Sequence, residues 1–344
     1  MRDSLLWPGL RAFFIAFFSM VGICLGVIPV IMILSYLISS EEMEPDQKYD
    51  VNIEANADGV RQYLSSDTPV ILAIDVRGII GLTDLTQERF RQQLIESRET
   101  VLKDNRVKGI LLEIESPGGT VVDADGIYRA LKHYKEKYNV PVYAYVDGLC
   151  ASGGMYVASA ADKIYASDVS LIGSVGVISP SFLNFSQLID KVGVQALTLY
   201  AGKGKDELNP LRPWKPDEQK PMEALIQYYY DMFVNIVTEN RPQMNKEKLV
   251  ADYGAHVFPA PEAYSYGFID GVGASREQVL NTLVKDLGLH DYQVMKLGSN
   301  VWYDLFFNSQ NSLFSGKIKH EVQLTPTANS ELMGKFLYMY QGAN

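Results

Sequence analysis

The apolar and charged positions divide the chain into a long hydrophobic run near the N-terminus and a mixed region that follows it. No charged residue occurs from Ala12 to Ser40, and most of this run is Phe, Ile, Leu, Val and Met. Because a helix that crosses a bilayer needs about 20 such residues, residues 12–40 are predicted to form a single transmembrane anchor. Arginines precede the run and acidic residues follow it. The positive-inside rule therefore predicts a cytoplasmic N-terminus (residues 1–11) and an exported remainder.

Beyond the anchor, short apolar runs alternate with amphipathic segments. The apolar runs predict strands over Pro69–Val76, Val107–Ile114, Val140–Val146, Lys163–Ala166 and Val194–Tyr200. The periodic segments predict helices over Thr86–Leu102, Val121–Tyr138, Phe185–Val192 and Pro216–Thr238. Strands separated by helices form right-handed crossovers on a mainly parallel sheet. The fold class is therefore α/β, with the site expected at the carboxyl ends of the strands.

Composition limits the function and the domain plan. The formal charge of −10 argues against a nucleic-acid partner, because surfaces that bind nucleic acids are basic. Two cysteines, one of them in the hydrophobic run, form no disulfide framework, and the sequence has no motif for a metal or a cofactor. Residues 41–68 are polar and acidic and predict a stalk with one short helix near Ala57–Leu64. Residues 69–292 then form the main domain, and residues 293–344 a C-terminal extension.

A serine follows the third predicted strand, in the sequence DGLCASGGMYVASAAD. The chain is expected to turn at Gly148, and the small residues after Ser152 predict a helix that neighbouring backbone can approach closely. A hydroxyl at the positive end of this helix is well placed for a nucleophile that transfers negative charge to a carbonyl oxygen. The alternative is a helix N-cap, which the serine alone does not exclude.

Two further groups favour the catalytic interpretation. Gly118 and Gly119 follow the second predicted strand, where backbone N–H groups without Cβ atoms around them suit an oxyanion hole, with Gly119 the better donor. A serine nucleophile also needs a base. The four histidines are poorly placed, which leaves a lysine made neutral by burial. Lys203 and Lys205 follow the predicted strand Val194–Tyr200.

Five segments together resemble the signal peptide peptidase A type of membrane protease, a Ser-Lys family related in fold to the caseinolytic-protease (ClpP) and crotonase group. They are SPGGTVVDADGIYRAL, VDGLCASGGMYVASAADKIYA, GSVGVIS, AGKGKDELNP and HVFPAPEAYSYGFIDGVG, in this order between residues 69 and 289. The resemblance implies repeated ββα units with a mainly parallel sheet. The chain length and single anchor resemble the short, one-unit members.

Position by position, the resemblance implies that Ser152 is the nucleophile. It implies that Lys205 is the base rather than Lys203, because Lys205 precedes Asn209 and the following proline by the family's spacing. A carboxylate close to the base would keep it charged. The neighbouring Asp206 is therefore expected to point away from Lys205.

The resemblance also implies roles around the dyad. Ser174 is expected to orient the lysine, and Gly119 to donate to the oxyanion. Gly118, Gly153 and Met155 are expected to border the substrate, and Met155 replaces the aromatic residue that the family usually has there.

The implied function is a membrane-anchored serine endopeptidase, without cofactor or metal, that cuts unfolded or hydrophobic peptides such as cleaved signal peptides or membrane-protein segments. Family members form ring- or dome-shaped homo-oligomers, here expected in the bacterial cytoplasmic membrane with the protease domain on the periplasmic side. Two alternatives stay open: a non-catalytic membrane scaffold of the same fold, and a crotonase-like acyl-CoA enzyme, which would need carboxylates in place of the Ser-Lys pair.

The C-terminal extension has apolar clusters at Val301–Phe307 and Phe336–Tyr340. Four roles are open for it: covering a neighbouring protomer, lying on the membrane, occupying the substrate groove, or adding a packing element.

Overall fold

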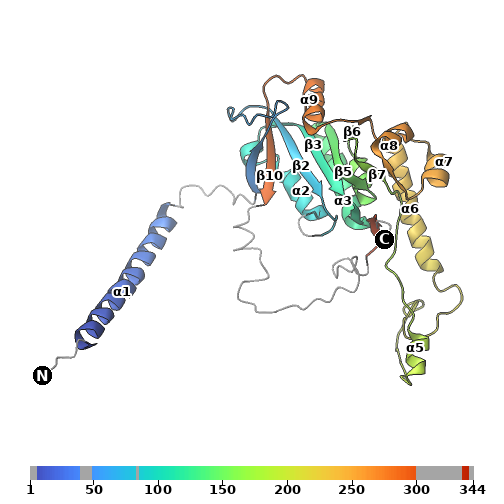
Figure 1. The fold of residues 1–344 in the computed structure, drawn as a ribbon, viewed down its shortest axis with the longest axis horizontal. Coiled ribbons are helices and arrows are strands. Elements are labelled where there is room, and N and C mark those ends of the chain that lie inside the picture. The colour runs from blue at the N-terminus through green and yellow to red at the C-terminus, as the bar shows by residue number, and fades with distance from the viewer. Residues whose placement is uncertain (1–5, 39–48, 83–84, 300–334, 341–344) are drawn as a thin grey trace. The chain divides into compact units, whose positions relative to one another are not determined.

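The computed structural model describes residues 6–38, 49–82, 85–299 and 335–340, and the chain divides into two compact units (Figure 1). The first unit, residues 1–48, contains helix α1 (Leu6–Ile38). Within α1, residues Leu10–Val30 have a mean hydropathy of 2.5, and they are long and apolar enough to cross a membrane.

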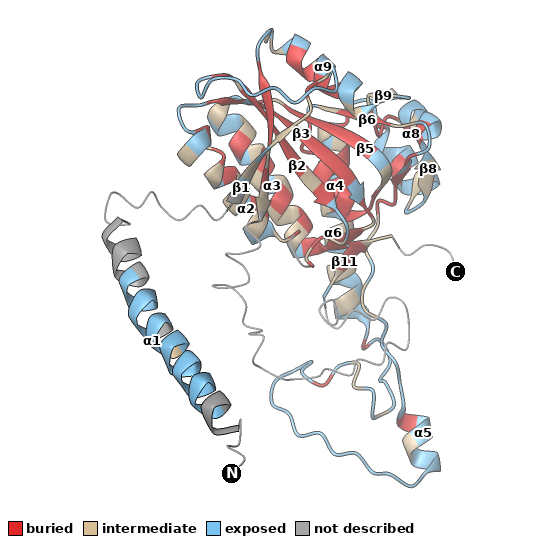
Figure 2. Cartoon of the chain, turned by 60° about the vertical axis from the view of Figure 1, so that its left-hand side comes forward, coloured by how far each residue is buried: buried red, intermediate tan, exposed pale blue. Residues whose placement is uncertain are grey.

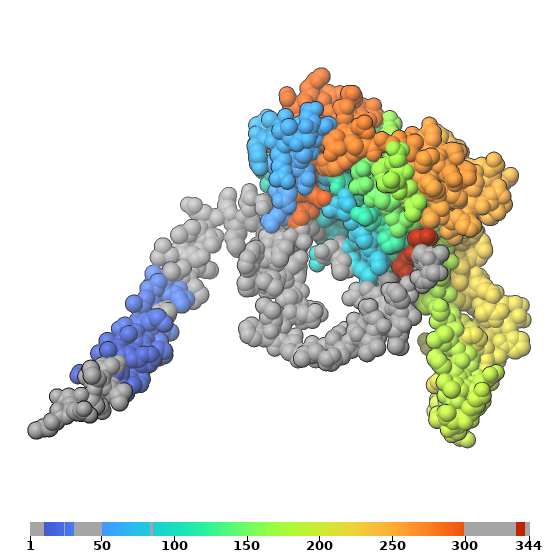
Figure 3. Space-filling view, viewed as in Figure 1, coloured from blue at the N-terminus to red at the C-terminus, as the bar shows by residue number. Residues whose placement is uncertain are grey.

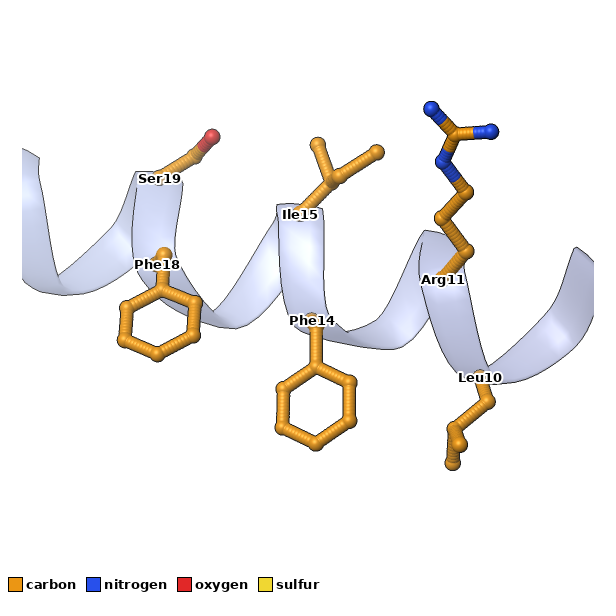
Figure 4. Close-up of a pocket in the computed structure, with 6 residues that line it drawn as sticks. All are labelled: Leu10, Arg11, Phe14, Ile15, Phe18 and Ser19. Atoms are coloured by element: carbon orange, nitrogen blue, oxygen red, sulfur yellow. The ribbon is translucent and has the colours of Figure 1, made fainter.

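A surface hollow on α1 is not a candidate active site. Figure 4 shows Leu10, Phe14 and Phe18 projecting from one side of the helix, with Arg11 and Ser19 on the other. All of its lining residues belong to this single helix. Exposed aromatic and aliphatic side chains of this kind suit a lipid-facing surface, and no set of polar groups converges on the hollow.

The second unit begins at Tyr49 and is built on a nine-stranded sheet. The main path of the sheet runs in the order β1 (Tyr49–Glu54), β10 (Gln293–Ser299), β2 (Val70–Arg77), β3 (Val107–Ser116), β5 (Val142–Ala151), β6 (Lys163–Ala166) and β9 (Gly271–Val272). Off this path, β7 (Leu171–Gly173) pairs with β5, and β8 (Val257–Pro259) pairs with β7. The β1–β10 and β7–β8 pairs are antiparallel, whereas the other pairs in this sheet are parallel. A separate antiparallel pair joins β4 (Gly118–Thr120) to β11 (Leu337–Met339).

Helices cover both faces of the sheet, because successive strand side chains belong to two apolar clusters. On β2, Val70, Leu72 and Ile74 belong to one cluster. That cluster includes side chains from α2 (Gln87–Glu96), α3 (Val121–Tyr138), α4 (Gly153–Ala158) and α6 (Lys220–Asn240). Ile71 and Ala73 belong to the other cluster, with α9 (Arg276–Asp286). Figure 2 shows the central strands buried between these layers. The remaining helical segments are η1 (Thr100–Leu102), α5 (Ser186–Lys191), α7 (Lys246–Lys248), η2 (Leu249–Tyr253) and α8 (Ala260–Tyr266).

The structure confirms the α/β class and most of the predicted elements. The helix Val121–Tyr138 and the strand Lys163–Ala166 have the predicted bounds. Two predicted elements are absent: residues 194–200 form no strand, and residues 57–64 form no helix. Leu197 and Leu199 are each 85% exposed. Within the described part of the chain, this segment pairs with no strand, and an apolar run is insufficient without a partner for the backbone.

The sheet also extends into regions that the sequence assigned elsewhere. Strand β1 lies in the predicted stalk, and β10 lies in the predicted C-terminal extension. The two pair with each other along six residue positions, from Tyr49–Ser299 to Glu54–Val294.

A buried carboxylate joins α9 to the sheet. Glu113 of β3 is 5% exposed, and its Oε1 accepts a hydrogen bond from Arg276 Nε at 2.5 Å. Arg77 and Lys296 lie 3.4 and 3.7 Å from the other oxygen. Burial alone would raise the pKa of Glu113, but the hydrogen bond and charge of Arg276, with the charges of Lys296 and Arg77, hold it below its ordinary value. The ionised carboxylate therefore depends on these partners.

Substitution of Arg276 by leucine is expected to lower the free energy of unfolding by about 3 kcal/mol near neutral pH, because it leaves the buried charge of Glu113 under-compensated. A depressed folded-state pKa stabilises the protein above the unfolded value, and this stabilisation is lost as the pH falls through the folded value. The difference in the free energy of unfolding between wild type and Arg276→Leu should therefore be smaller at about pH 4 than near neutral pH. Urea unfolding of the full chain in detergent at both pH values measures it.

Arg77→Leu is the control for this prediction. The Arg77 side chain is 41% exposed, so its loss should change stability by less than about 1 kcal/mol. A loss for Arg276→Leu that is equally large at both pH values would contradict the assignment to Glu113.

Candidate active site

Ser152 lies directly between a strand and a helix. Strand β5 continues past Gly148 to Ala151, and α4 begins at Gly153. The predicted end of this strand near Gly148 is therefore wrong. A register irregularity between β3 and β5 accommodates Gly148, which has a φ of 108°, and pairing resumes at Cys150.

The backbone of Ser152 is strained. Its φ of 55° and ψ of −118° are outside the regions that residues with a Cβ normally occupy. Such a conformation costs on the order of 1–3 kcal/mol and is characteristic of functional sites. The hydroxyl caps no backbone N–H of α4 and has no hydrogen-bond partner among the described residues. The N-cap alternative is therefore not supported, and the hydroxyl is free to act as a nucleophile.

Strand β7 brings Ser174 beside Ser152. Ala151 pairs with Gly173 in parallel register, and the Ser152 N–H donates to the Gly173 carbonyl at 2.9 Å. Ser174 also has a positive φ, 57°, and its N–H donates to the carbonyl of His256 at 2.6 Å. The two serines thus leave adjacent strand ends at the carboxyl edge of the sheet.

Strand β4 directs one backbone N–H group to the same place. Ile80 N–H donates to the Gly118 carbonyl, and Thr120 N–H donates to the Ile80 carbonyl, both at 2.9 Å. Because backbone groups alternate in direction along a strand, the N–H of Gly119 points away from Ile80. A Cβ on Gly119 would collide with the Ile80 carbonyl, so only glycine fits there.

Gly153 contributes a second N–H group. It is the first residue of α4, so its N–H has no partner within the helix. A Cβ on Gly153 would lie 3.1 Å from the nitrogen of Gly119. Two backbone donors therefore border one small space beside Ser152, which is the arrangement of an oxyanion hole.

Two neighbours of Ser152 are buried and have no direct role in this geometry. The Cys150 thiol is fully buried, and burial raises its pKa to about 12, so it stays protonated and is no competing nucleophile. Met155 is also fully buried, in the cluster that packs α4 against the sheet.

Lys205 lies on an arm formed by residues 180–219. The arm follows β7, includes α5 and returns to α6, and Figures 1 and 3 show it projecting beyond the sheet. Lys203 and Lys205 are both exposed. Within the described residues, no hydrogen bond or ion pair joins the Lys205 side chain to Ser152 or Ser174. Within a single chain, Ser152, Ser174 and Gly119 therefore lie together, whereas Lys205 is not bonded to this group.

The carboxylate beside Lys205 is bound within the arm. Asp206 accepts a hydrogen bond from Arg212 Nε and another from Asn209 Nδ2, each at 2.5 Å, and Arg212 also pairs with Glu218. These hydrogen bonds lower the pKa of Asp206, and the bond from Arg212 lowers that of Glu218 to about 2. The Asp206 carboxylate is thus held by Arg212 rather than by Lys205.

The sequence also left part of the site unassigned. Strand β11 pairs with β4, and Tyr338 is fully buried against Tyr156, four residues after Ser152. The only sequence signal for this contact is the apolar cluster at residues 336–340; the cluster at residues 301–307 lies outside the described residues.

The fold and the site define a class: an α/β protein with a strained serine at a strand-to-helix turn beside two backbone donors. Comparison with known families agrees with this class. Residues 134–289 match the model of peptidase family S49, and residues 69–170 match the Clp protease model.

The chain is similar to individual proteins of the same kind. It is 32% identical over 232 residues to the Enterococcus faecium protein named "Putative signal peptide peptidase SppA", a match that covers 66% of each chain. It is 34% identical over 215 residues to the Synechocystis protein named "Putative protease slr0021", covering 62% of this chain and 74% of that one. A mutant ClpP1 from Listeria monocytogenes has a TM-score of 0.40 at 18% identity, over 62% of this chain and 96% of that one. The chain belongs to peptidase family S49 and is a serine peptidase.

The strain at Ser152 predicts a stability difference between two inactive variants. Both Ser152→Ala and Ser152→Gly lack the hydroxyl, but only glycine tolerates the observed φ without a steric penalty. Ser152→Gly is expected to be more stable than Ser152→Ala by about 1 kcal/mol. Urea unfolding of the two full-length variants in the same detergent measures the difference. Equal stability, or a less stable glycine variant, would show that the turn is not strained.

Proposed function

We propose that this chain is a membrane-anchored endopeptidase that uses Ser152 as its nucleophile. The observation that supports this most is the strained serine beside the N–H groups of Gly119 and Gly153. Ser152 Oγ attacks the peptide carbonyl carbon, and the two donors stabilise the oxyanion that forms. The C–N bond then breaks, the amine leaves with a proton, and water hydrolyses the acyl-serine to restore the hydroxyl.

The base in this proposal is Lys205 of a neighbouring copy of the chain. Lys205 is exposed on the arm, and the Asp206 carboxylate next to it is already bound by Arg212. The arm also exposes large apolar side chains, including Leu197 and Leu199, each at 85%. Association of identical chains would bury these residues and would remove Lys205 from water, which favours the neutral amine that a base requires. The Ser174 hydroxyl, beside Ser152, would then form a hydrogen bond with that amine. A neutral hydroxyl orients the amine but does not favour its protonated form.

Lys203 serves as the internal comparison, because it lies on the same arm and is equally exposed. The spacing to Asn209 selects Lys205. The arm holds Asn209 in a defined place, since its side chain bonds both Thr198 and Asp206.

Helix α1 supports attachment to a membrane, with the proposed orientation of a cytoplasmic N-terminus and an exported enzyme. The proposed substrates are unfolded or hydrophobic peptides, including signal peptides after their release from secreted proteins. The name of the Enterococcus relative agrees with this substrate class. The small residues around the site suit an extended chain that bonds through its backbone.

Mixing two inactive variants tests the proposed assembly. Ser152→Ala and Lys205→Ala should each abolish cleavage of an unfolded protein, whereas Lys203→Ala should retain it. If the dyad forms between chains, co-expression of the two inactive variants restores activity. In a random equal mixture about a quarter of the sites combine an intact serine with an intact lysine from the neighbour.

The measurement is the rate of casein cleavage by purified oligomers in detergent, with equal assembly checked by size-exclusion chromatography. Full activity of Lys205→Ala would refute the assigned base. Loss of activity in both single variants without recovery in the mixture would refute a dyad formed between chains.

A further inference from the structure

A pocket of about 240 Å³ lies between α2 and α3, and none of its lining residues belongs to the candidate active site. The two helices lie side by side on one face of the sheet (Figures 1 and 2). The lining positions on each helix are three or four residues apart, so they share one helix face. They include Arg91 and Ile95 of α2, and His133, Tyr134, Lys137 and Tyr138 of α3.

The lining of this pocket is apolar at its base and cationic at its edge. Leu94 and Tyr134 are buried, Ile95 is 40% exposed, and Arg91 and Lys137 are exposed. None of the described side chains that line the pocket is acidic. Neither Arg91 nor Lys137 forms an ion pair with a described carboxylate. Apolar surface beside unpaired cations fits a ligand that is anionic at one end and apolar at the other.

A third cation lies against the aromatic side of the pocket. The guanidinium carbon of Arg98 lies 4.6 Å from the centroid of the Tyr134 ring and 4.1 Å from that of Tyr138. Its Nη1 donates to the side-chain oxygen of Asn105 at 3.3 Å, whereas its buried Nε and Nη2 have no partner among the described residues. The positive charge of Arg98 is therefore under-compensated, and an anion in the adjacent pocket would stabilise it.

Helix α2 lies beside the first strand that follows α1. Gln93 Nε2 donates to the carbonyl of Leu297 at 3.4 Å, and Leu297 of β10 pairs with Val51 of β1. Ten residues, 39–48, separate α1 from β1. Ten extended residues reach at most about 36 Å. With α1 in a bilayer, the strand next to α2 therefore stays within this distance of the end of the anchor.

Charge favours a lipid of that bilayer as the ligand. The chain has a formal charge of −10, so an anionic membrane surface repels the chain as a whole. A local group of unpaired cations determines which face can approach such a surface. The apolar base of the pocket also suits the glycerol and first acyl carbons of a phospholipid, which a free inorganic anion lacks.

We propose that the pocket between Arg91 and Lys137 binds the headgroup of an anionic phospholipid. This inference rests on the membrane attachment that forms part of the proposed function. The phosphate lies between the two exposed cations, and the glycerol lies on Ile95 and the Tyr138 ring. The pocket is smaller than the roughly 300–1,000 Å³ of sites that enclose a drug-sized ligand. It therefore takes the headgroup and leaves the acyl chains in the bilayer, so that the bound lipid holds the protease body at the membrane surface.

Hydrogen exchange followed by mass spectrometry tests the inference on the full-length chain in lipid nanodiscs. Discs of phosphatidylcholine alone are compared with discs that also contain phosphatidylglycerol. A ligand at ten times its Kd slows exchange about tenfold where opening destroys its site. Residues 87–98 and 130–138 should therefore exchange about tenfold more slowly in the phosphatidylglycerol discs. Residues 276–286 of α9, on the other face of the sheet, should exchange equally in both.

Two double variants separate the pocket from the overall charge. Arg91→Gln with Lys137→Gln should abolish the difference between the two kinds of disc, while the chain still cleaves casein in detergent. Lys108→Gln with Lys285→Gln is the matched control, because it removes two charges from exposed lysines outside the pocket. This control should keep the full difference.

The results that would overturn the inference are distinct from failure of the proposed function. Equal exchange in both kinds of disc by a chain that cleaves casein refutes the lipid site alone. Slower exchange that survives Arg91→Gln with Lys137→Gln, or that the control also loses, refutes the pocket. Equal slowing by inorganic phosphate in phosphatidylcholine discs refutes the lipid as the ligand. Lipid-dependent slowing in a chain that cleaves no casein supports the lipid site and contradicts only the proposed catalysis. A chain that does not enter nanodiscs contradicts the membrane attachment and the inference together.

Discussion

The hydrogen bond from the Ser152 N–H to the Gly173 carbonyl, 2.9 Å long, joins the two strand ends on which the site depends. Because β5 and β7 are parallel, Ser152 and Ser174 leave the sheet side by side, each with a positive φ. Backbone strain of about 1–3 kcal/mol per residue persists only where the surroundings enforce it. Here β5 pairs with β3, β6 and β7, and all six residues of α4 are buried. Stability of the sheet thus maintains the strained turn at Ser152.

The chemistry is divided between a rigid body and an exposed arm. In the proposed mechanism, the body holds Ser152 and the N–H groups of Gly119 and Gly153, whereas the arm holds Lys203 and Lys205 in solvent. Within the arm, Arg212 pairs with Asp206 and Glu218 and so holds the loop in place. The Asp206 carboxylate is therefore already paired, whereas an unpaired carboxylate there would favour the charged form of the neighbouring Lys205. If the proposed dyad forms between chains, the site would act only after assembly, which would limit proteolysis by single chains.

The elements that could be predicted from the sequence are those whose stability is local or strongly patterned. The helix Val121–Tyr138 has an amphipathic repeat and polar caps, and β3 contains the apolar run Ile110–Leu112. Ser152 and Gly119 could be proposed from the sequence because glycines and small residues mark close backbone approach, whereas Ser174 was proposed only from the family resemblance. The strand predicted at Val194–Tyr200 is absent because an apolar run does not by itself provide a pairing partner. Strand β11 could not be predicted, because it has three residues and its pairing depends on a partner more than 200 positions away.

Labelling with a fluorophosphonate probe would show directly whether Ser152 is the nucleophile, because such probes react with an activated serine hydroxyl. The assembled full-length chain would be treated with the probe, digested, and the modified residue identified by mass spectrometry. Modification is expected at Ser152, and none in the Ser152→Ala chain. Slower labelling is expected in Lys205→Ala, where the proposed base is missing but the fold is intact. Modification at another serine, or no modification of a chain that cleaves casein, would contradict the assignment of Ser152 as the nucleophile.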